Sequence, residues 1–178
     1  NSGPTSWTIG SPGASPYAVT LGAYSTVYKG TAIFSSRGPS TPWYRDHPNA
    51  WAADLAKYGD DLQKPDCVAP GGGPVADGQQ VDQIYSSVTG WTNGMGDNNP
   101  FDVWDSMRGT SMATPHAAGL IALAYEGGAI KTSRDVLKKL AVTASGPSRA
   151  TGEGRATAST ARSGKSLAAG YGFLTFER

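Results

Sequence analysis

The sequence has little charge and a single cysteine. Charged residues make up 16% of its 178 positions and the formal net charge is +1, whereas a typical globular domain is roughly 25% charged. A net charge this close to zero gives no sign of the basic surface that nucleic-acid binding requires, so we expect no nucleic-acid partner. Cys67 alone cannot form an intrachain disulfide or a multi-cysteine metal site. A lone cysteine fits a cytosolic protein and a secreted one equally well.

Long hydrophobic runs are also missing. The longest, from Met112 to Tyr125, has 14 residues and is interrupted by His116. A membrane-spanning helix needs about 20, so we expect no membrane association. The 24 glycines and 12 prolines stay below the share of roughly 25–30% that indicates a disordered chain. The sequence begins without Met or a signal-peptide pattern, and we interpret it as a fragment or a processed chain.

The hydrophobic pattern predicts strands that alternate with helices, which is typical of an α/β fold with parallel strand pairs. Residues 145–165 are rich in small polar residues and predict a surface loop. We expect strands at 17–24, 31–34, 81–88, 101–107 and 171–176, a strand end within 64–73, and helices at 49–58, 111–125 and 133–142.

The helix at 111–125 is predicted most firmly by its pattern. It is apolar on all sides, which indicates a buried helix. Pro115 is expected in its first turn, where the missing N–H costs least, and Gly127 with Gly128 should end it. For the other two helices we expect Asn49 as a cap and Asp135 paired with Thr132 in a variant of the capping box.

Ser111 lies in the string GTSMATPHAAG, which covers residues 109–119. A serine at the start of a helix lies beside unpaired N–H groups and the positive end of the helix dipole. Both would stabilise negative charge on a carbonyl that Ser111 attacks, and Gly109 would let a substrate backbone come close. The alternative is that Ser111 is an ordinary N-cap, the usual role of serine at this position.

The string at 109–119 resembles the nucleophile motif of the subtilisin-like serine proteases, or subtilases. FSSRGP at 34–39, KPDCVAPGGG at 64–73 and GYGFL at 170–174 also resemble segments of that family, in the family's order. Thr175 departs from it, because the family has Asn at this point. The resemblance implies an α/β fold with a doubly wound, mostly parallel sheet and a long buried helix that follows the nucleophile serine.

The resemblance also implies a function, the hydrolysis of peptide bonds through an acyl-enzyme on Ser111. Asn1, in the string NSG, resembles the family's asparagine whose side chain donates into the oxyanion hole. Substrate would bind as an extended strand. The residues that resemble the family's substrate-binding positions are Ser11, Pro12, Gly13, Ala14, Gly109 and Thr110.

A subtilase triad runs Asp, His, Ser along the chain, and the first two precede the asparagine that Asn1 resembles. We therefore interpret residues 1–178 as the C-terminal portion of a subtilase catalytic domain that is inactive alone. Its expected partners are a polypeptide substrate and the N-terminal half of the same protease, in an extracellular or secreted setting. We expect His116 to be a structural histidine directed into the core, and His47, within 41–63, to face solvent.

Two other function classes remain as alternatives. The chain could be a non-catalytic half-domain or regulatory fragment that binds peptide or its own N-terminal half. An α/β-hydrolase esterase is disfavoured, because no G-x-S-x-G elbow surrounds Ser111.

The chemistry expected at Ser111 needs no cofactor. A calcium ion is possible, because oxygen-bearing side chains cluster at Asp97, Asn98, Asn99 and Asp102; the alternative is a turn-forming cluster. Carbonyls of residues 12–16 are a second candidate for a cation. Cys67 is expected to be buried and inert. The basic run Arg149, Arg155, Arg162 and Lys165 is expected on a solvated surface loop.

Overall fold

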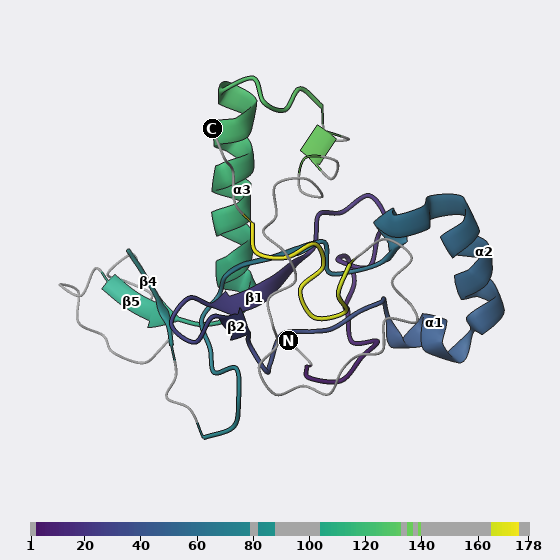
Figure 1. The fold of residues 1–178 in the computed structure, drawn as a ribbon, viewed down its shortest axis with the longest axis horizontal. Coiled ribbons are helices and arrows are strands. Elements are labelled where there is room, and N and C mark those ends of the chain that lie inside the picture. Colours follow the sequence, from purple (N-terminus) through teal and green to yellow (C-terminus); the bar gives the residue numbers. More distant parts are fainter. Residues whose placement is uncertain are drawn as a thin grey trace.

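Two small β-sheets and one long helix form the centre of the structure, with two shorter helices to one side (Figure 1). The structure is a computed structural model, and it describes residues 3–78, 82–87, 104–132, 135–136, 139 and 165–174. The elements, in chain order, are β1 (Leu21–Ser25), β2 (Gly30–Thr31), α1 (Pro42–Asp46), α2 (Pro48–Tyr58), the 3₁₀ turn η1 (Gly59–Leu62), β3 (Cys67–Pro70), β4 (Ile84–Ser87), β5 (Trp104–Met107) and α3 (Thr110–Glu126).

The first sheet has three strands in the order β2-β1-β3. β1 and β3 are parallel, with Leu21 opposite Cys67 and Ala23 opposite Ala69, whereas β2 returns antiparallel to β1 through a short turn. The α/β class is confirmed. Among the described strands, β1 and β3 pair parallel, whereas β2 pairs antiparallel with β1 and β4 pairs antiparallel with β5. The doubly wound, mostly parallel sheet stays a prediction.

β3 is the most deeply buried strand. Cys67, Val68 and Ala69 have no exposed surface, as expected for an apolar strand covered on both faces. α3 contacts β1 and β3 through small residues, since Ala113 and Ala117 lie one turn apart and are both buried. Methyl side chains on both elements let the helix lie close against the sheet.

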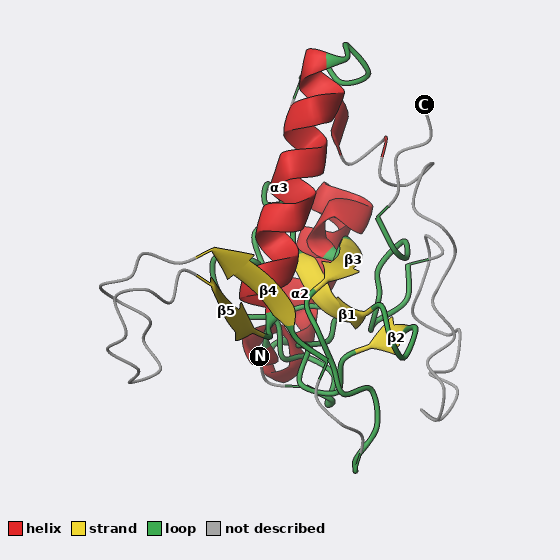
Figure 2. Cartoon of the chain, turned by 90° about the vertical axis from the view of Figure 1, so that its left-hand side faces the viewer, coloured by secondary structure: helices red, strands yellow, loops and turns green. Residues whose placement is uncertain are grey.

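α3 begins within one residue of its predicted start, but it is not buried on all sides. Its buried residues are Ala113, Ala117 and Ala124, whereas Leu123 is 64% and Tyr125 40% exposed. The prediction is wrong because β1 and β3 cover one face only, and the helix extends well beyond the strands (Figures 1 and 2). Among the described residues, no helix is both long and apolar enough to cross a bilayer.

Pro115 lies one turn further into α3 than expected. It is the sixth residue of the helix, and its missing N–H leaves the Ser111 carbonyl without its usual i+4 donor. The predicted end is confirmed: Gly127 is the C-cap, and Gly128 has a φ of +72°, the left-handed conformation typical of glycine after a helix.

The helix predicted at 49–58 is α2, preceded by the unpredicted α1. Each begins with a proline, Pro42 or Pro48, a residue that suits the first helical position. Asn49 is therefore not the cap, because Pro48 already starts the helix and His47 is the N-cap.

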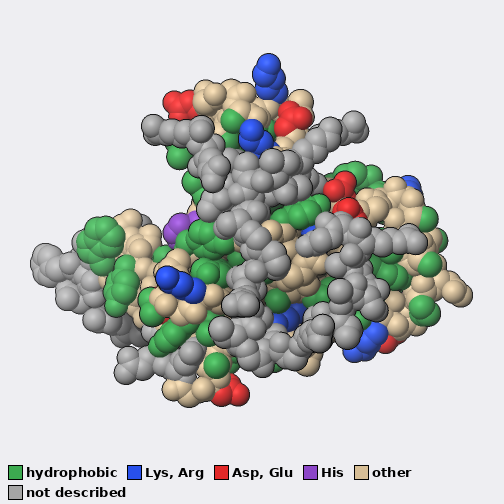
Figure 3. Space-filling view, viewed as in Figure 1, with side chains coloured by type: hydrophobic (Ala, Val, Ile, Leu, Met, Phe, Trp, Pro, Cys, Tyr) green, Lys and Arg blue, Asp and Glu red, His purple; other side chains and the backbone are tan. Residues whose placement is uncertain are grey.

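The strands predicted at 81–88 and 101–107 contain β4 and β5, which form a separate antiparallel pair. Hydrophobic side chains gather over this hairpin (Figure 3), and Tyr85 and Trp104 are largely exposed there. No strand is found at 171–174, the described part of the range predicted at 171–176; this segment makes a single bridge, from Phe173 to Val68.

Other expectations concern residues near or outside the described ranges. The Asp135 carboxylate accepts hydrogen bonds from the Thr132 N–H at 2.8 Å and the Thr132 hydroxyl at 2.9 Å, which confirms that pairing. The loop predicted at 145–165 lies outside the described residues, except for Lys165. The predicted calcium cluster also lies outside them, with the residues Asp97, Asn98, Asn99 and Asp102.

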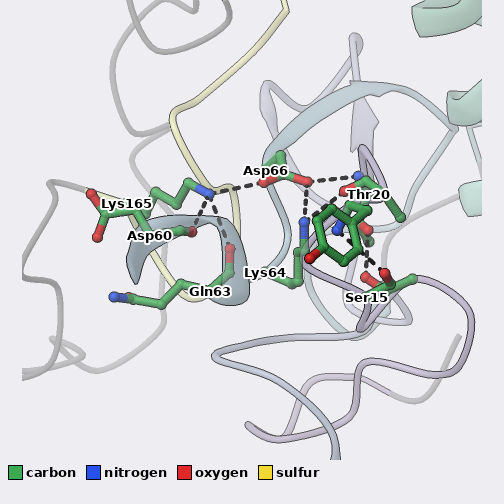
Figure 4. A network of polar contacts seen from close by, with 10 residues as sticks. Ser15, Thr20, Asp60, Gln63, Lys64, Asp66 and Lys165 are labelled. Atoms are coloured by element: carbon green, nitrogen blue, oxygen red, sulfur yellow. Dashed lines mark hydrogen bonds and ion pairs between the residues drawn. The ribbon is translucent and has the colours of Figure 1, made fainter. Parts of the chain in front are cut away.

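A buried ion cluster joins four segments of the fold (Figure 4). The fully buried Asp66 carboxylate accepts hydrogen bonds from Lys64 Nζ at 2.9 Å, Lys165 Nζ at 2.8 Å and the Thr20 N–H at 2.7 Å. Burial lowers the pKa of Lys64, and the Asp66 charge opposes that shift. The expectation that Lys165 is solvated is wrong, because its ammonium is buried beside Asp66.

The Lys165 ammonium is satisfied on all sides. It also donates to the carbonyls of Asp60, at 2.9 Å, and Gln63, at 3.0 Å, and lies 4.7 Å from the centroid of the Tyr171 ring. A buried ammonium is tolerated only when its protons find acceptors in this way. The cluster thereby fixes η1 and residues 165–171 against the start of β3.

We predict that Asp66→Asn destabilises the protein strongly. The variant keeps the side-chain shape but leaves two buried ammonium groups without a counter-charge, so the free energy of unfolding should fall by about 3–5 kcal/mol in urea titrations. Lys165→Met is the control, because it leaves a neutral pair of Lys64 and Asp66, and its loss should be clearly smaller. A loss from Lys165→Met that equals the loss from Asp66→Asn would contradict this account.

Candidate active site

Ser111 is placed by a direct bond between the sheet and the start of α3. The Gly109 N–H donates to the carbonyl of Gly71, which follows β3, at 2.8 Å. Gly109 has a φ of +148°, a conformation that favours glycine. A Cβ on Gly71 would meet the Gly109 carbonyl oxygen at 2.8 Å and Ala23 Cβ at 2.7 Å. Both glycines are therefore needed for this close approach.

Ser111 is exposed and is the second residue of α3. The N-cap is Gly109, and no side chain caps the helix, so the alternative that Ser111 is an ordinary N-cap is wrong. Within the first turn, the N–H groups of Met112 and Ala113 donate to the Gly109 carbonyl at 3.0 Å and 3.3 Å. The Ser111 hydroxyl lies at the positive end of a 17-residue helix.

The loop before β1 contains the other predicted substrate contacts. Ser11 and Pro12 are exposed, and Gly13 and Ala14 are half-buried. The loop is folded back on itself, because the Ala14 N–H donates to the carbonyl of Gly10 at 3.1 Å. Of the two predicted neighbours of Ser111, Thr110 is half-buried and Gly109 is buried.

Asn1 lies outside the described residues, so its predicted role stays a prediction. The segment that follows it is anchored, since the Gly3 N–H donates to the carbonyl of Phe34 at 3.1 Å.

His116 lies beside a cavity of about 350 Å³ between the β4–β5 hairpin and α3. Its Nδ1 is 2.7 Å from the Met112 carbonyl oxygen; because a carbonyl cannot donate, Nδ1 carries the proton. The expectation that His116 points into the core is wrong, because the side chain is exposed. The reason is that the sheet covers only the opposite face of α3.

His47 is solvent-exposed, as predicted. It joins α1 to α2, stacks on Trp43 with ring centroids 4.4 Å apart, and holds the Trp43 carbonyl at 2.8 Å through Nδ1. Within the described residues, neither histidine forms a hydrogen bond with a carboxylate. Neither one therefore has the acidic partner that orients a catalytic base.

The described segments contain no group of three His, Cys, Asp or Glu side chains that could hold a metal ion. The predicted calcium cluster lies outside them. The second candidate cation site is the loop at 12–16. Close to it in sequence, the Ala18 carbonyl accepts a hydrogen bond from the Lys64 ammonium at 2.6 Å.

The ion cluster and the cavity beside His116 are not predicted above from the sequence. A signal for the ion pair is present in KPD at 64–66, where Lys and Asp lie two residues apart before a buried strand. Lys165 carried no such signal, because its partners are about 100 positions away in the chain.

Cys67 is inaccessible within β3. Burial, and secondarily the Asp66 charge, raises the pKa of its thiol to about 12. A thiol that stays protonated is a poor nucleophile, which supports the expectation that Cys67 is inert.

We predict that Cys67 resists iodoacetamide at pH 8 in the folded protein and reacts quickly in 8 M urea at about the rate of a free thiol, as followed by mass spectrometry. An unfolded thiol ionises near pH 9 while the folded one does not, so Cys67 should make stability fall as pH rises above about 9. Rapid labelling of the folded protein would refute this burial.

Comparison with known proteins agrees with these features. The family model described as "Subtilase family" matches residues 1–172. Pyrolysin from Pyrococcus furiosus is 32% identical over 152 residues, which cover 79% of this chain and 9% of pyrolysin. Serine protease AprX from Bacillus subtilis is 33% identical over 132 residues, which cover 69% of this chain and 24% of AprX.

A solved structure described as an S41 psychrophilic protease has a similar fold, with a TM-score of 0.58 and 25% identity over 99% of this chain. The match spans 46% of that structure, so this chain covers less than half of each of these relatives. The family match over nearly the whole chain, together with the glycine-supported serine at the start of α3, shows that the chain belongs to the subtilase family.

Proposed function

We propose that this chain is the C-terminal portion of a subtilase catalytic domain and supplies the nucleophile of a serine endopeptidase. The observation that carries the proposal is the position of Ser111, exposed at the start of α3 and fixed there by the bond from Gly109 to Gly71. The relationship to serine proteases supports it.

In the proposed reaction, Ser111 Oγ attacks the peptide carbonyl and transfers its proton to a base. The oxyanion accepts hydrogen bonds from the Ser111 N–H and from Asn1 Nδ2, at the positive end of α3. The amine leaves with the proton from that base, and water then hydrolyses the acyl-enzyme by the same route.

We propose that the general base and its orienting carboxylate come from the N-terminal half of the protease. His47 lies between α1 and α2 and is engaged with Trp43, and His116 projects beside the hairpin cavity. Without a base, serine is a weak nucleophile at neutral pH, so residues 1–178 alone are expected to be inactive.

The substrate is an extended polypeptide in this proposal. The exposed loop at 11–14 would line the pocket for the side chain on the acyl side of the scissile bond, the P1 residue, and Gly109 and Thr110 would lie along the substrate backbone. The enzyme would act in an extracellular or secreted setting, without a cofactor.

The N-terminal half is the proposed partner of α3. The large exposed side chains of Leu123 and Tyr125 lie on a helix whose pattern is apolar on all sides, and covering them would complete its burial within a doubly wound sheet. The exposed surface at Leu123 and Tyr125 also fits the alternative function, a non-catalytic half-domain that binds its N-terminal half. A measurement of peptide hydrolysis at Ser111 distinguishes the protease from this alternative.

We predict that Ser111→Ala in the intact protease abolishes peptide hydrolysis. The expected loss is about 10⁶-fold in kcat, the size established for the nucleophile of subtilisin itself rather than one obtained from this structure. Thr114→Ala, which removes another exposed hydroxyl from the same helix, is the control and should stay within about threefold of the unmodified enzyme. Hydrolysis by Ser111→Ala at the unmodified rate would reject the proposal.

A further inference from the structure

Lys64 and Asp66 bind the loop at 10–20 through three hydrogen bonds, one of which joins the Asp66 N–H to the Thr20 carbonyl at 2.8 Å. Lys64 Nζ donates to the Ala18 carbonyl at 2.6 Å, and the Thr20 N–H donates to the Asp66 carboxylate at 2.7 Å. The Thr20 hydroxyl extends this connection, because it donates to the Gly13 carbonyl at 2.6 Å. Asp66 is thus linked to the middle of the loop through a single intervening residue (Figure 4).

Besides these bonds, the loop is held by Val19, which packs partly buried against the core, and by the Tyr17 ring, which lies 6.0 Å from the Tyr58 ring. No residue from 10 to 20 is buried, and Tyr17 is 84% exposed. Its remaining described bonds are mostly internal, such as the Ser15 N–H to the Pro12 carbonyl at 3.0 Å. Because no side chain of the loop is fully buried, its position relative to the sheet depends strongly on its polar contacts with Lys64 and Asp66.

The two lysines share Asp66 but serve different segments. Lys64 donates to the loop, whereas the other two bonds of Lys165 go to Asp60 and Gln63 in and beside η1. Their side chains are equally inaccessible, 0% and 3% exposed. Removal of either ammonium leaves one lysine paired with Asp66, so the two changes have the same effect on buried charge.

We infer that Lys64 and Asp66 are positioning residues that hold the loop at 10–20 in the shape of the P1 pocket and thereby set which P1 side chains the protease accepts. The inference rests on the proposed function, because it takes residues 11–14 as part of that pocket. The cluster acts through Thr20 and Ala18 rather than by touching the substrate.

The test compares Lys64→Met with Lys165→Met in the intact protease. Peptides that differ only at P1, with Phe, Leu, Ala or Lys, give kcat/KM ratios for each variant. Lys64→Met should lower the ratio between the best and worst peptides by about tenfold, mainly through KM, since it loses a hydrogen bond from a charged donor to the loop. Lys165→Met should change that ratio by less than about threefold, because its lost bonds lie elsewhere.

Hydrogen exchange provides a readout that needs no activity. Amides in residues 10–20 should exchange about tenfold faster in Lys64→Met, whereas in Lys165→Met the acceleration should be confined to residues 59–63 and 165–171. If the unmodified protease hydrolyses none of the peptides, the proposed function fails. Hydrogen exchange of residues 10–20 still tests whether the ion cluster holds the loop in place.

If Lys64→Met does not fold, Thr20→Val replaces it. This variant keeps the Asp66 bond to the Thr20 N–H and removes only the bond to the Gly13 carbonyl, so it should lower the P1 ratio in the same direction. An equal change of the P1 ratio in both lysine variants, or unchanged exchange of residues 10–20 in Lys64→Met, would overturn the inference. An unchanged P1 ratio in Thr20→Val would overturn it as well.

Discussion

The Asp66 carboxylate is the contact on which the arrangement of this chain depends. One buried anion binds two ammonium groups and a backbone N–H, and these come from the loop before β1, from the approach to β3 and from the C-terminal segment. The ordering entropy of these three segments opposes folding, and the small sheet offers few apolar side chains to offset it. A charged centre specifies the arrangement of these segments, because loss of any one partner leaves an unpaired buried charge, which is strongly destabilising.

β3 connects this centre to the proposed nucleophile. Asp66 immediately precedes the strand, and Gly71, which binds Gly109, immediately follows it. Only four residues, Cys67–Pro70, separate the anchor of the proposed substrate loop from the anchor of the serine turn. The string KPDCVAPG therefore serves both ends of the site, with ion-pairing residues before the strand, small buried residues within it, and a glycine that permits the close contact after it.

The sequence alone was sufficient for the elements whose signals are local. α2 and α3 were predicted within two residues, and Gly128, Thr132 and Asp135 took their expected roles at helix ends. The errors about burial share a non-local cause. His116 and the outer face of α3 were predicted to be buried because the helix is apolar all round, but burial depends on what packs against it. Lys165 was predicted to be solvated because its neighbours in sequence are polar, whereas its partner Asp66 lies 99 positions away.

The motif around Ser111 predicted a nucleophile, and the fold supports that role through the turn at Gly109. The central claim is that Ser111 is the reactive serine of the protease. Treatment of the intact protease with a fluorophosphonate, followed by digestion and peptide mapping, tests this claim most directly. The account predicts one adduct per molecule, on the peptide that contains Ser111. Labelling of a different serine, or none in a protease that hydrolyses peptides, would contradict it.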